Sequence, residues 1–293
     1  MVKEVIGRIF KPTWVVKLIS SQLDADRLDY LFRDSLMTGT GYGKFDLDWL
    51  LNVLRIGMVN GDYEIGLDYE KGVKVAETFI MARYSMYLQV YYHKTTRGAE
   101  VLLDRILNRA AEVVDKCQIE SGDALLKLIK GENISVSEYL DLDDNVLVAL
   151  IKDWAKSEDG ILSDLCTRFL HRRLFKSIDI SSVSGHAIAF AEKYNRAKSI
   201  CRKQFPPEYY LASDSAENSP YKDYYIFPPG GEGEKDEKAR EATEQIYLFP
   251  KDLNPEELSN ASDVVKALRN RKYIKERLYF PAEMREKINE IFA

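Results

Sequence analysis

The chain has 293 residues, of which 45% are hydrophobic and 30% charged, and its formal net charge is −5. That length is enough for one large domain or two smaller ones with a real core. The acidic balance argues against a generic nucleic-acid binder, because such proteins draw their affinity from a basic excess. Cys117, Cys166 and Cys201 lie far apart without CxxC spacing, which indicates reduced buried thiols rather than a disulfide framework or zinc knuckle.

No apolar run approaches the roughly 20 residues that cross a bilayer, so we expect no membrane partner. The first residues lack the apolar core and cleavage site of a signal peptide. We therefore expect a cytoplasmic protein.

Residue spacing predicts the elements of the first two thirds of the chain in order. A lead-in at 1–19 is broken by Pro12, and a helix with a start like a capping box runs from Ser21 to about Met37. A short helix at 46–53 and a hairpin at 58–69, which turns at Asn60-Gly61-Asp62, come next. A long helical stretch then runs from 73 to about 116, with a break near 93–97. Further helices are expected at 123–130, 136–140, 143–157, 163–174 and about 185–205.

After Pro206-Pro207 the character of the sequence changes. Strands are expected at 224–227, 246–249 and 277–280, a solvated loop at 230–244 and a helix near 254–270. We expect a mainly α protein, with a helical body at 1–205 and a smaller α+β part at 206–293.

One face of a predicted helix near the start of the chain has side chains that could bind a metal ion or a substrate. At a period of 3.6, Asp26, Tyr30 and Asp34 fall on one face and Arg27 borders it. A carboxylate can hold a hard cation, a guanidinium can clamp phosphate, and a phenol with a second acid can meet a sugar. The same spacing also fits a solvated face laced with ion pairs.

A second predicted helix also places a guanidinium and phenols on one face. Arg83, Tyr87 and Tyr91 are spaced four residues apart, and His93 and Lys94 follow. An aromatic stripe at helical spacing also fits plain core packing, and a lone histidine is usually structural. Spacing by itself leaves both alternatives open.

The stretch from Ser20 to Tyr30, followed by Arg33-Asp34, closely resembles the late conserved helix of HD-domain metal-dependent phosphohydrolases, including the dNTP triphosphohydrolases. Supporting stretches resemble the same branch at 38–39, 42–46, 83–94, 97–100, 172–176 and 277–281. The resemblance implies the C-terminal part of an HD helical core at 1–130, a helical HD-associated region at 131–205 and an α+β subdomain at 206–293.

In that family a histidine, a His-Asp pair and a final aspartate hold a divalent metal, which activates water to attack phosphorus. Asp26 matches the final aspartate. The resemblance therefore implies a divalent cofactor (Mn, Mg, Fe, Ni or Zn), with Asp26 as one of its ligands.

The other matched positions are implied to bind substrate. Arg27 stands where the best-known members have a phosphate-facing lysine, and Arg83 matches a phosphate-binding arginine. Tyr30 matches a pocket tyrosine, and Asp34 matches an acid that faces the sugar 3′-hydroxyl. Tyr91 matches a tyrosine near the sugar. Tyr87 stands where histidine is common, so this position departs from the family's pattern.

The remaining metal ligands have no match in these residues. His93, His171 and His186 are followed by Lys, Arg and Ala, so the sequence contains no His-Asp pair. One carboxylate cannot replace about four ligands. We therefore expect an incomplete site: a truncated or split protein whose upstream HD half is supplied by a separate chain.

Such a half chain should leave an apolar face open, and Trp14, Val15 and Val16 are candidates for that face. The family also tends to oligomerise, so a homo-oligomer remains open.

Two functions from different classes follow. The first is the C-terminal part of a phosphohydrolase acting on (deoxy)nucleoside triphosphates or related phosphate esters, inactive without its other half. The second is a non-catalytic module that binds a nucleotide or a protein. A weaker third reading is a plain helical scaffold.

Overall fold

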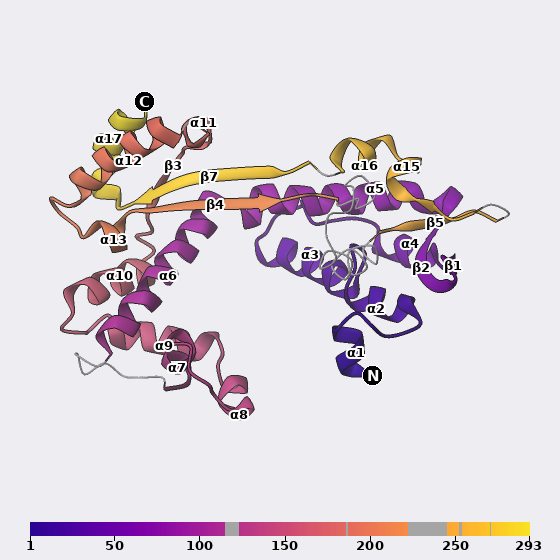
Figure 1. Ribbon diagram of the computed structural model, residues 1–293, viewed down its shortest axis with the longest axis horizontal. Coiled ribbons are helices and arrows are strands. Elements are labelled where there is room, and N and C mark those ends of the chain that lie inside the picture. The colour runs from indigo at the N-terminus through magenta and orange to yellow at the C-terminus, as the bar shows by residue number, and fades with distance from the viewer. Residues whose placement is uncertain (115–122, 186, 222–244, 252–253, 270) are drawn as a thin grey trace. The chain divides into compact units, whose positions relative to one another are not determined.

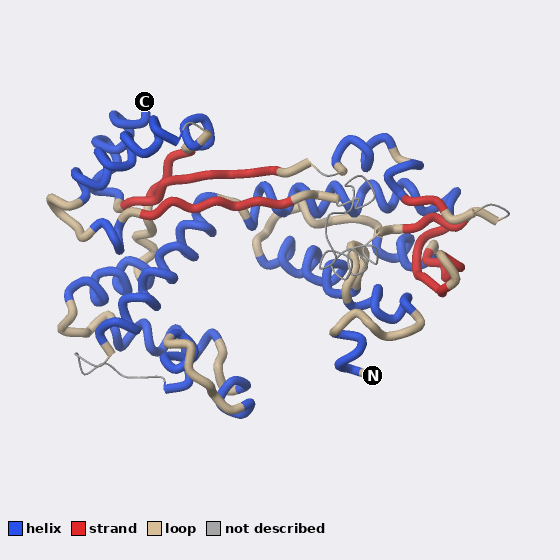
Figure 2. Tube along the Cα trace, viewed as in Figure 1, coloured by secondary structure: helices blue, strands red, loops and turns tan. Residues whose placement is uncertain are grey.

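The computed structural model describes residues 1–114, 123–185, 187–221, 245–251, 254–269 and 271–293. Helices dominate, with two small groups of strands (Figures 1 and 2), so the expected mainly α fold with an α+β part is confirmed. Within these residues, no helix combines the length and apolar character needed to cross a membrane.

The chain forms two compact units, and each is built from two separate segments: Met1–Tyr91 with Glu217–Tyr273, and Tyr92–Ala216 with Ile274–Ala293. These units differ from the consecutive division at 130 and 205. The difference arises because strands late in the chain return to join elements from its beginning, which a division by composition along the sequence does not detect.

The first unit contains eight helices and four strands among its described residues. They are α1 (Val2–Ile6), α2 (Thr13–Ile19), α3 (Ala25–Met37), α4 (Leu47–Asn52), β1 (Leu54–Val59), β2 (Asp62–Asp68), α5 (Tyr69–Met86), a π-helix (Tyr87–Tyr91), β5 (Tyr247–Phe249), β6 (Glu256–Glu257), α15 (Leu258–Ala261) and α16 (Asp263–Leu268).

The sheet of this unit has the order β1-β2-β5-β6, with β2 and β5 parallel and the outer pairs antiparallel. The predicted hairpin is confirmed as β1 and β2. Asn60 and Gly61 both have positive φ, 50° and 84°, which is the backbone of a two-residue turn that matches strand twist. The core of the unit gathers Leu31, Phe79 and Leu248, all fully buried, so α3, α5 and β5 share one interior.

The second unit begins with α6 (Lys94–Val113). Its other elements are α7 (Asp123–Ile129), α8 (Val136–Leu140), α9 (Asp144–Trp154), α10 (Gly160–Leu170), β3 (Lys176–Asp179), α11 (Ser181–Ser184), α12 (Ala187–Cys201), α13 (Pro207–Tyr210), β4 (Ala212–Asn218), β7 (Tyr273–Phe280), a 3-10 turn (Ala282–Met284) and α17 (Arg285–Phe292). Strands β4 and β7 begin or end a residue or two across the division between units.

A three-stranded sheet of order β3-β7-β4 lies in this part, with Lys176 paired to Phe280 at one end of the β3–β7 ladder. Leu102, Trp154 and Leu278 are fully buried in the core of the second unit. The expected strand at 277–280 is therefore confirmed and is longer than predicted, whereas β3, β4 and α17 were not predicted.

Two details of the lead-in differ from expectation. The capping residue of α3 is Asp24, whose carboxylate accepts from the Arg27 backbone N–H at 2.8 Å, whereas Ser21 lies in the preceding turn and donates its own N–H to Asp24. The prediction of an open face at Trp14, Val15 and Val16 is wrong for Val16, which is 1% exposed because α2 packs against β2.

The helix expected near 254–270 is divided between β6, α15 and α16. A new cap explains the second break, because the Ser262 side chain accepts from the Val265 N–H and restarts the helix. The strand at 224–227 and the loop at 230–244 lie outside the described residues.

Candidate functional site

Helices α3 and α5 of the first unit, labelled in Figure 1, pack against each other. Six of the seven predicted site residues lie in one neighbourhood on these helices. The two helices contribute Arg27, Tyr30 and Asp34 from α3, and Arg83, Tyr87 and Tyr91 from α5 and its π-helical extension. We call these six residues the guanidinium–tyrosine cluster.

The aromatic rings hold the cluster together. Tyr91 meets Tyr30 edge-on at 6.2 Å between ring centroids and Tyr87 at 5.0 Å, both with an interplanar angle of 72°. The Tyr91 hydroxyl donates to Asp34 Oδ2 at 2.6 Å. The Arg83 guanidinium lies 5.6 Å from the centroid of the Tyr87 ring, within cation–π range. Asp34, the acid that the resemblance places at the sugar, therefore already accepts one hydrogen bond within the protein.

Both arginines of the cluster carry buried donors without an acceptor among the described residues. Arg83 is 7% exposed; its Nη1 donates to the Pro220 carbonyl at 3.4 Å, but its Nε has no partner. Arg27 has its Nε 3.6 Å from Asp24 Oδ2, while its buried Nη1 has no partner. Leaving a buried donor unsatisfied costs about 1–3 kcal/mol, so each of these guanidinium donors favours an anionic acceptor.

The phenol of Tyr30 lies within the influence of both cations. Burial raises the pKa of Tyr30 to about 12, with Tyr87 adding to the rise, while Arg83 and Arg27 act in the opposite direction. Burial, reinforced by the hydrogen bond to Asp34, also raises the pKa of Tyr91. Both phenols therefore stay protonated at neutral pH and act as neutral hydrogen-bond donors.

We expect the free energy of unfolding to fall as pH rises from about 10 to about 12. An unfolded tyrosine titrates near 10, so in this window the unfolded chain has lost a proton that folded Tyr30 still holds, and unfolding becomes more favourable. Chemical denaturation at a series of pH values checks this. Tyr30→Phe should flatten part of the fall, and an unchanged slope in that variant would contradict the assignment.

Asp26 is the predicted site residue outside the cluster. It is exposed near the start of α3. No group of three or more His, Cys, Asp or Glu residues able to hold a metal ion is present in the described part of the chain. The described residues therefore do not make a complete metal site around Asp26.

The histidines stand apart from the cluster. His93 is exposed and caps α6, accepting from the Thr95 N–H at 3.3 Å. His171 is exposed at the end of α10, and His186 lies outside the described residues. Cys166 and Cys201 are free and buried, as predicted, and burial raises their pKa to about 12 and about 11, so neither is a reactive thiolate. Cys117 is not described.

Sequence reasoning missed two features of the cluster. One is the π-helix Tyr87–Tyr91, a conformation that often marks functional sites. The other is the Pro220 carbonyl, which comes from a position 137 residues away from Arg83. The four-residue tyrosine spacing predicted the shared face, but nothing in the sequence distinguishes a π-turn from an α-turn.

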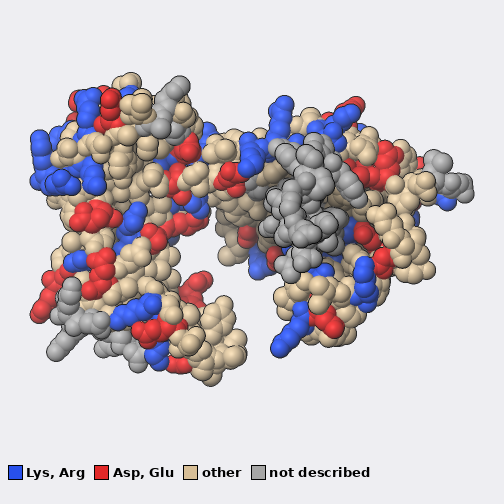
Figure 3. Space-filling model, viewed as in Figure 1, with Lys and Arg blue, Asp and Glu red and all other residues tan. Residues whose placement is uncertain are grey.

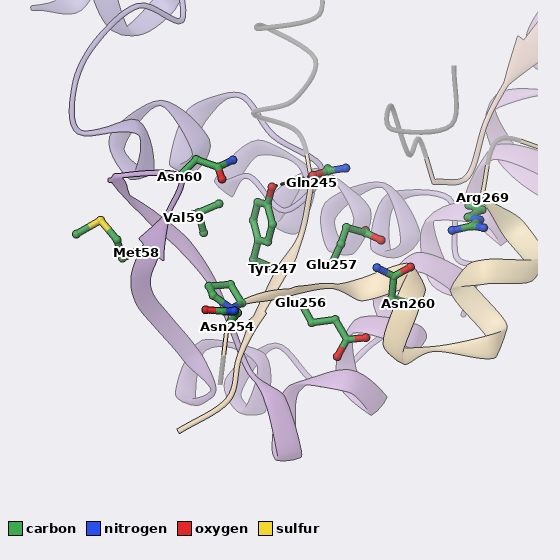
Figure 4. Close-up of a pocket in the computed structure, with 11 residues that line it drawn as sticks. Met58, Val59, Asn60, Gln245, Tyr247, Asn254, Glu256, Glu257, Asn260 and Arg269 are labelled. Atoms are coloured by element: carbon green, nitrogen blue, oxygen red, sulfur yellow. Dashed lines mark hydrogen bonds between the residues drawn. The ribbon is translucent and has the colours of Figure 1, made fainter. Parts of the chain in front are cut away.

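The first unit also has a polar pocket of about 610 Å³, shown in Figure 4, in which Tyr247 stands between the β1–β2 turn and β6. Two of its charged side chains bind neighbouring residues: Glu257 accepts from the Ser259 N–H at 2.8 Å and from the Tyr221 hydroxyl, and Arg269 donates to the Ser259 hydroxyl at 3.2 Å. An anion gains less here than at the cluster, where buried guanidinium donors lack acceptors.

Residues 57–203, half of the chain, match the model of the family described as "HD associated region". The chain belongs to that family. It is also 35% identical to the Bacillus subtilis protein YwfO over 97% of its own length and 61% of that protein's length.

Two solved structures share the fold. A phosphohydrolase from Bacteroides thetaiotaomicron superposes with a TM-score of 0.70 at 25% identity, over 94% of this chain and 66% of its own. A protein from Aquifex aeolicus gives 0.66 at 21% identity, over 100% and 64%, and shows the fold alone. The chain thus spans about two thirds of the length of these relatives.

Proposed function

We propose that the chain is part of an HD-type phosphohydrolase whose guanidinium–tyrosine cluster binds the phosphate groups of a nucleoside triphosphate or related phosphate ester. The single observation that carries this proposal is the pair of buried donors, Arg27 Nη1 and Arg83 Nε, that lack an acceptor beside one protonated phenol. The family match and the Bacteroides phosphohydrolase support the reaction class.

The recognition of a sugar is the finer part of the proposal. Tyr91 and Asp34 form a hydrogen-bonded pair next to the two cations, which suits a sugar hydroxyl adjacent to a bound phosphate. Figure 3 shows acidic side chains among the basic ones on the face that it draws, and the net charge of the chain is −5, so a small anion that enters the cluster fits better than a long polyanion.

The metal is also part of the proposal. Asp26 would supply one oxygen ligand to a divalent ion, and the other ligands would come from an HD half outside these 293 residues, which contain no His-Asp pair. A nucleotide-binding module without hydrolysis is the second candidate, favoured by the exposed position of Asp26 without a second ligand group in the described residues.

We expect the purified chain to bind inorganic triphosphate but to leave dNTPs intact when Mn²⁺ or Mg²⁺ is added, because its metal ligands are incomplete. Calorimetry measures the binding, and release of triphosphate measures hydrolysis. Arg27→Met should weaken binding about tenfold, the loss of one charge-assisted hydrogen bond. Asp26→Asn should leave metal-free binding unchanged, because its carboxylate is exposed.

The binding measurement and the hydrolysis measurement together distinguish the enzyme from the binding module. Hydrolysis by the chain alone would contradict a shared metal site. Binding that needs neither arginine would contradict the phosphate site itself. Hydrolysis that appears only when an HD half is added would support the enzyme over the binding module.

A further inference from the structure

Tyr87 stands between two other members of the guanidinium–tyrosine cluster, at the residue where α5 ends and the π-helix begins. It follows Arg83 by one helical turn, and the guanidinium carbon of Arg83 lies 5.6 Å from the centroid of its ring. At that distance the cation is attracted by the ring electrons. The Tyr87 ring therefore contacts the arginine whose Nε is a buried donor without an acceptor among the described residues.

The Arg83 side chain has few polar contacts that fix its direction. Among the described residues it makes one hydrogen bond, from Nη1 to the Pro220 carbonyl at 3.4 Å. That bond is long for an N–H···O hydrogen bond, so it restrains the guanidinium only weakly. The contact with the Tyr87 ring is then the main further restraint on the direction of this group.

The Tyr87 ring is itself held in place from α3. It meets the Tyr91 ring edge-on at 5.0 Å between centroids, and the Tyr91 hydroxyl donates to Asp34 Oδ2 at 2.6 Å. A continuous set of contacts therefore runs from Asp34 on α3 through two aromatic rings to the guanidinium of Arg83. All of these residues belong to the first unit.

We propose that Tyr87 is a positioning residue, whose ring holds the Arg83 guanidinium in the orientation that leaves Nε available to a ligand, and that it does not bind the ligand itself. An arginine side chain has several rotatable bonds, and a donor that is already ordered loses less entropy when the ligand arrives. The inference rests on the proposed function only in naming phosphate as the ligand, because the ring and the guanidinium are in contact without one.

The first test needs no ligand. In protein labelled with nitrogen-15 arginine, NMR measures how fast the Arg83 Nε proton exchanges with solvent, and Arg83→Met identifies the signal by its loss. We expect exchange about tenfold faster in Tyr87→Leu and in Tyr87→Met, because a guanidinium without the ring contact turns more freely. Tyr87→Phe keeps the ring and should bring the rate back to within about threefold of the wild type.

Tyr84→Leu is the matched control for the exchange measurement. Tyr84 is a half-buried tyrosine of the same helix, and its ring contacts no guanidinium in the described part of the chain. This variant should leave the exchange rate of the Arg83 proton unchanged. A rate that stays at the wild-type value in Tyr87→Leu, or that rises equally in Tyr84→Leu, would overturn the proposal.

The second test distinguishes an action through Arg83 from a direct contact with the ligand. Calorimetry with inorganic triphosphate compares the effect of Tyr87→Leu in the wild-type chain with its effect in the Arg27→Met and Arg83→Met chains. We expect about fivefold weaker binding in the wild-type chain, a similar loss with Arg27→Met, and no further loss with Arg83→Met. An undiminished loss in the Arg83→Met chain would mean that Tyr87 touches the ligand, which contradicts a positioning role.

The two measurements distinguish a failure of this inference from a failure of the proposed function. If the wild-type chain binds no triphosphate, the phosphate site is wrong, but the exchange rates still show whether Tyr87 holds Arg83. If triphosphate binds and Tyr87→Leu changes neither the exchange rate nor the affinity, the phosphate site stands and the positioning role is wrong.

Discussion

Replacing Arg83 with methionine is expected to weaken the binding of inorganic triphosphate by between about 10-fold and about 100-fold. The guanidinium is 7% exposed and its Nε has no acceptor in the described residues, so a phosphate oxygen would gain a desolvated, charge-assisted hydrogen bond there. Such bonds contribute about 1.5–3 kcal/mol. Calorimetric titration of the wild type and variant measures the ratio of dissociation constants.

A stability measurement distinguishes a binding role for Arg83 from a structural one. Methionine removes a buried charge that makes one long hydrogen bond, of 3.4 Å, to the Pro220 carbonyl, so the free energy of unfolding should change by less than about 1 kcal/mol. Arg55→Met is the control: that guanidinium is 42% exposed beside Asp68 and should not affect triphosphate binding. A large loss of stability with unchanged binding would make Arg83 a structural residue.

Gly66→Ala is expected to lower the free energy of unfolding by about 3 kcal/mol, the upper end of the range for overpacking. A Cβ at Gly66 would lie 2.2 Å from the carbonyl oxygen of Tyr247, the residue it pairs with in the β2–β5 ladder. A main-chain atom cannot rotate away as a side chain can, so the two strands must separate. Thermal and urea unfolding followed by circular dichroism measures the loss.

The matched control is Gly41→Ala, because nothing lies within 4 Å of a Cβ built at Gly41. That variant should stay within about 0.5 kcal/mol of the wild type. A loss at Gly41 as large as the loss at Gly66 would contradict the prediction, because the close approach of β2 and β5 would then not be what limits stability.

Local rules predicted the elements whose determinants are adjacent in the sequence. The Asn60-Gly61 pair supplies two residues that tolerate positive φ, so the hairpin was predictable. The helix at 136–140 begins at a capping box in which Ser135 and Glu138 satisfy each other's backbone N–H groups. These interactions need no knowledge of the rest of the chain.

Elements that depend on distant partners were not predictable in the same way. Strand β3 has only four residues, and its strand conformation comes from pairing with β7, about 100 positions later. The shared face of Arg83, Tyr87 and Tyr91 followed from helical spacing, but their meeting with Tyr30 and Asp34 depends on the packing of α5 against α3. The roles assigned to the cluster and to Asp26 remain predictions, as do the cytoplasmic location and the homo-oligomer.

The interruption of the first unit by the second has a consequence for how the protein is made. The ribosome releases β2 and α5 long before β5, which follows more than 170 residues after β2. Until then the nascent chain has a strand edge without its parallel neighbour, and such edges recruit other strands. The Pro220 carbonyl, which accepts a hydrogen bond from Arg83, is also synthesised long after α5. The edge of β2 therefore stays without this neighbour while residues 92–216, the first segment of the second unit, are synthesised.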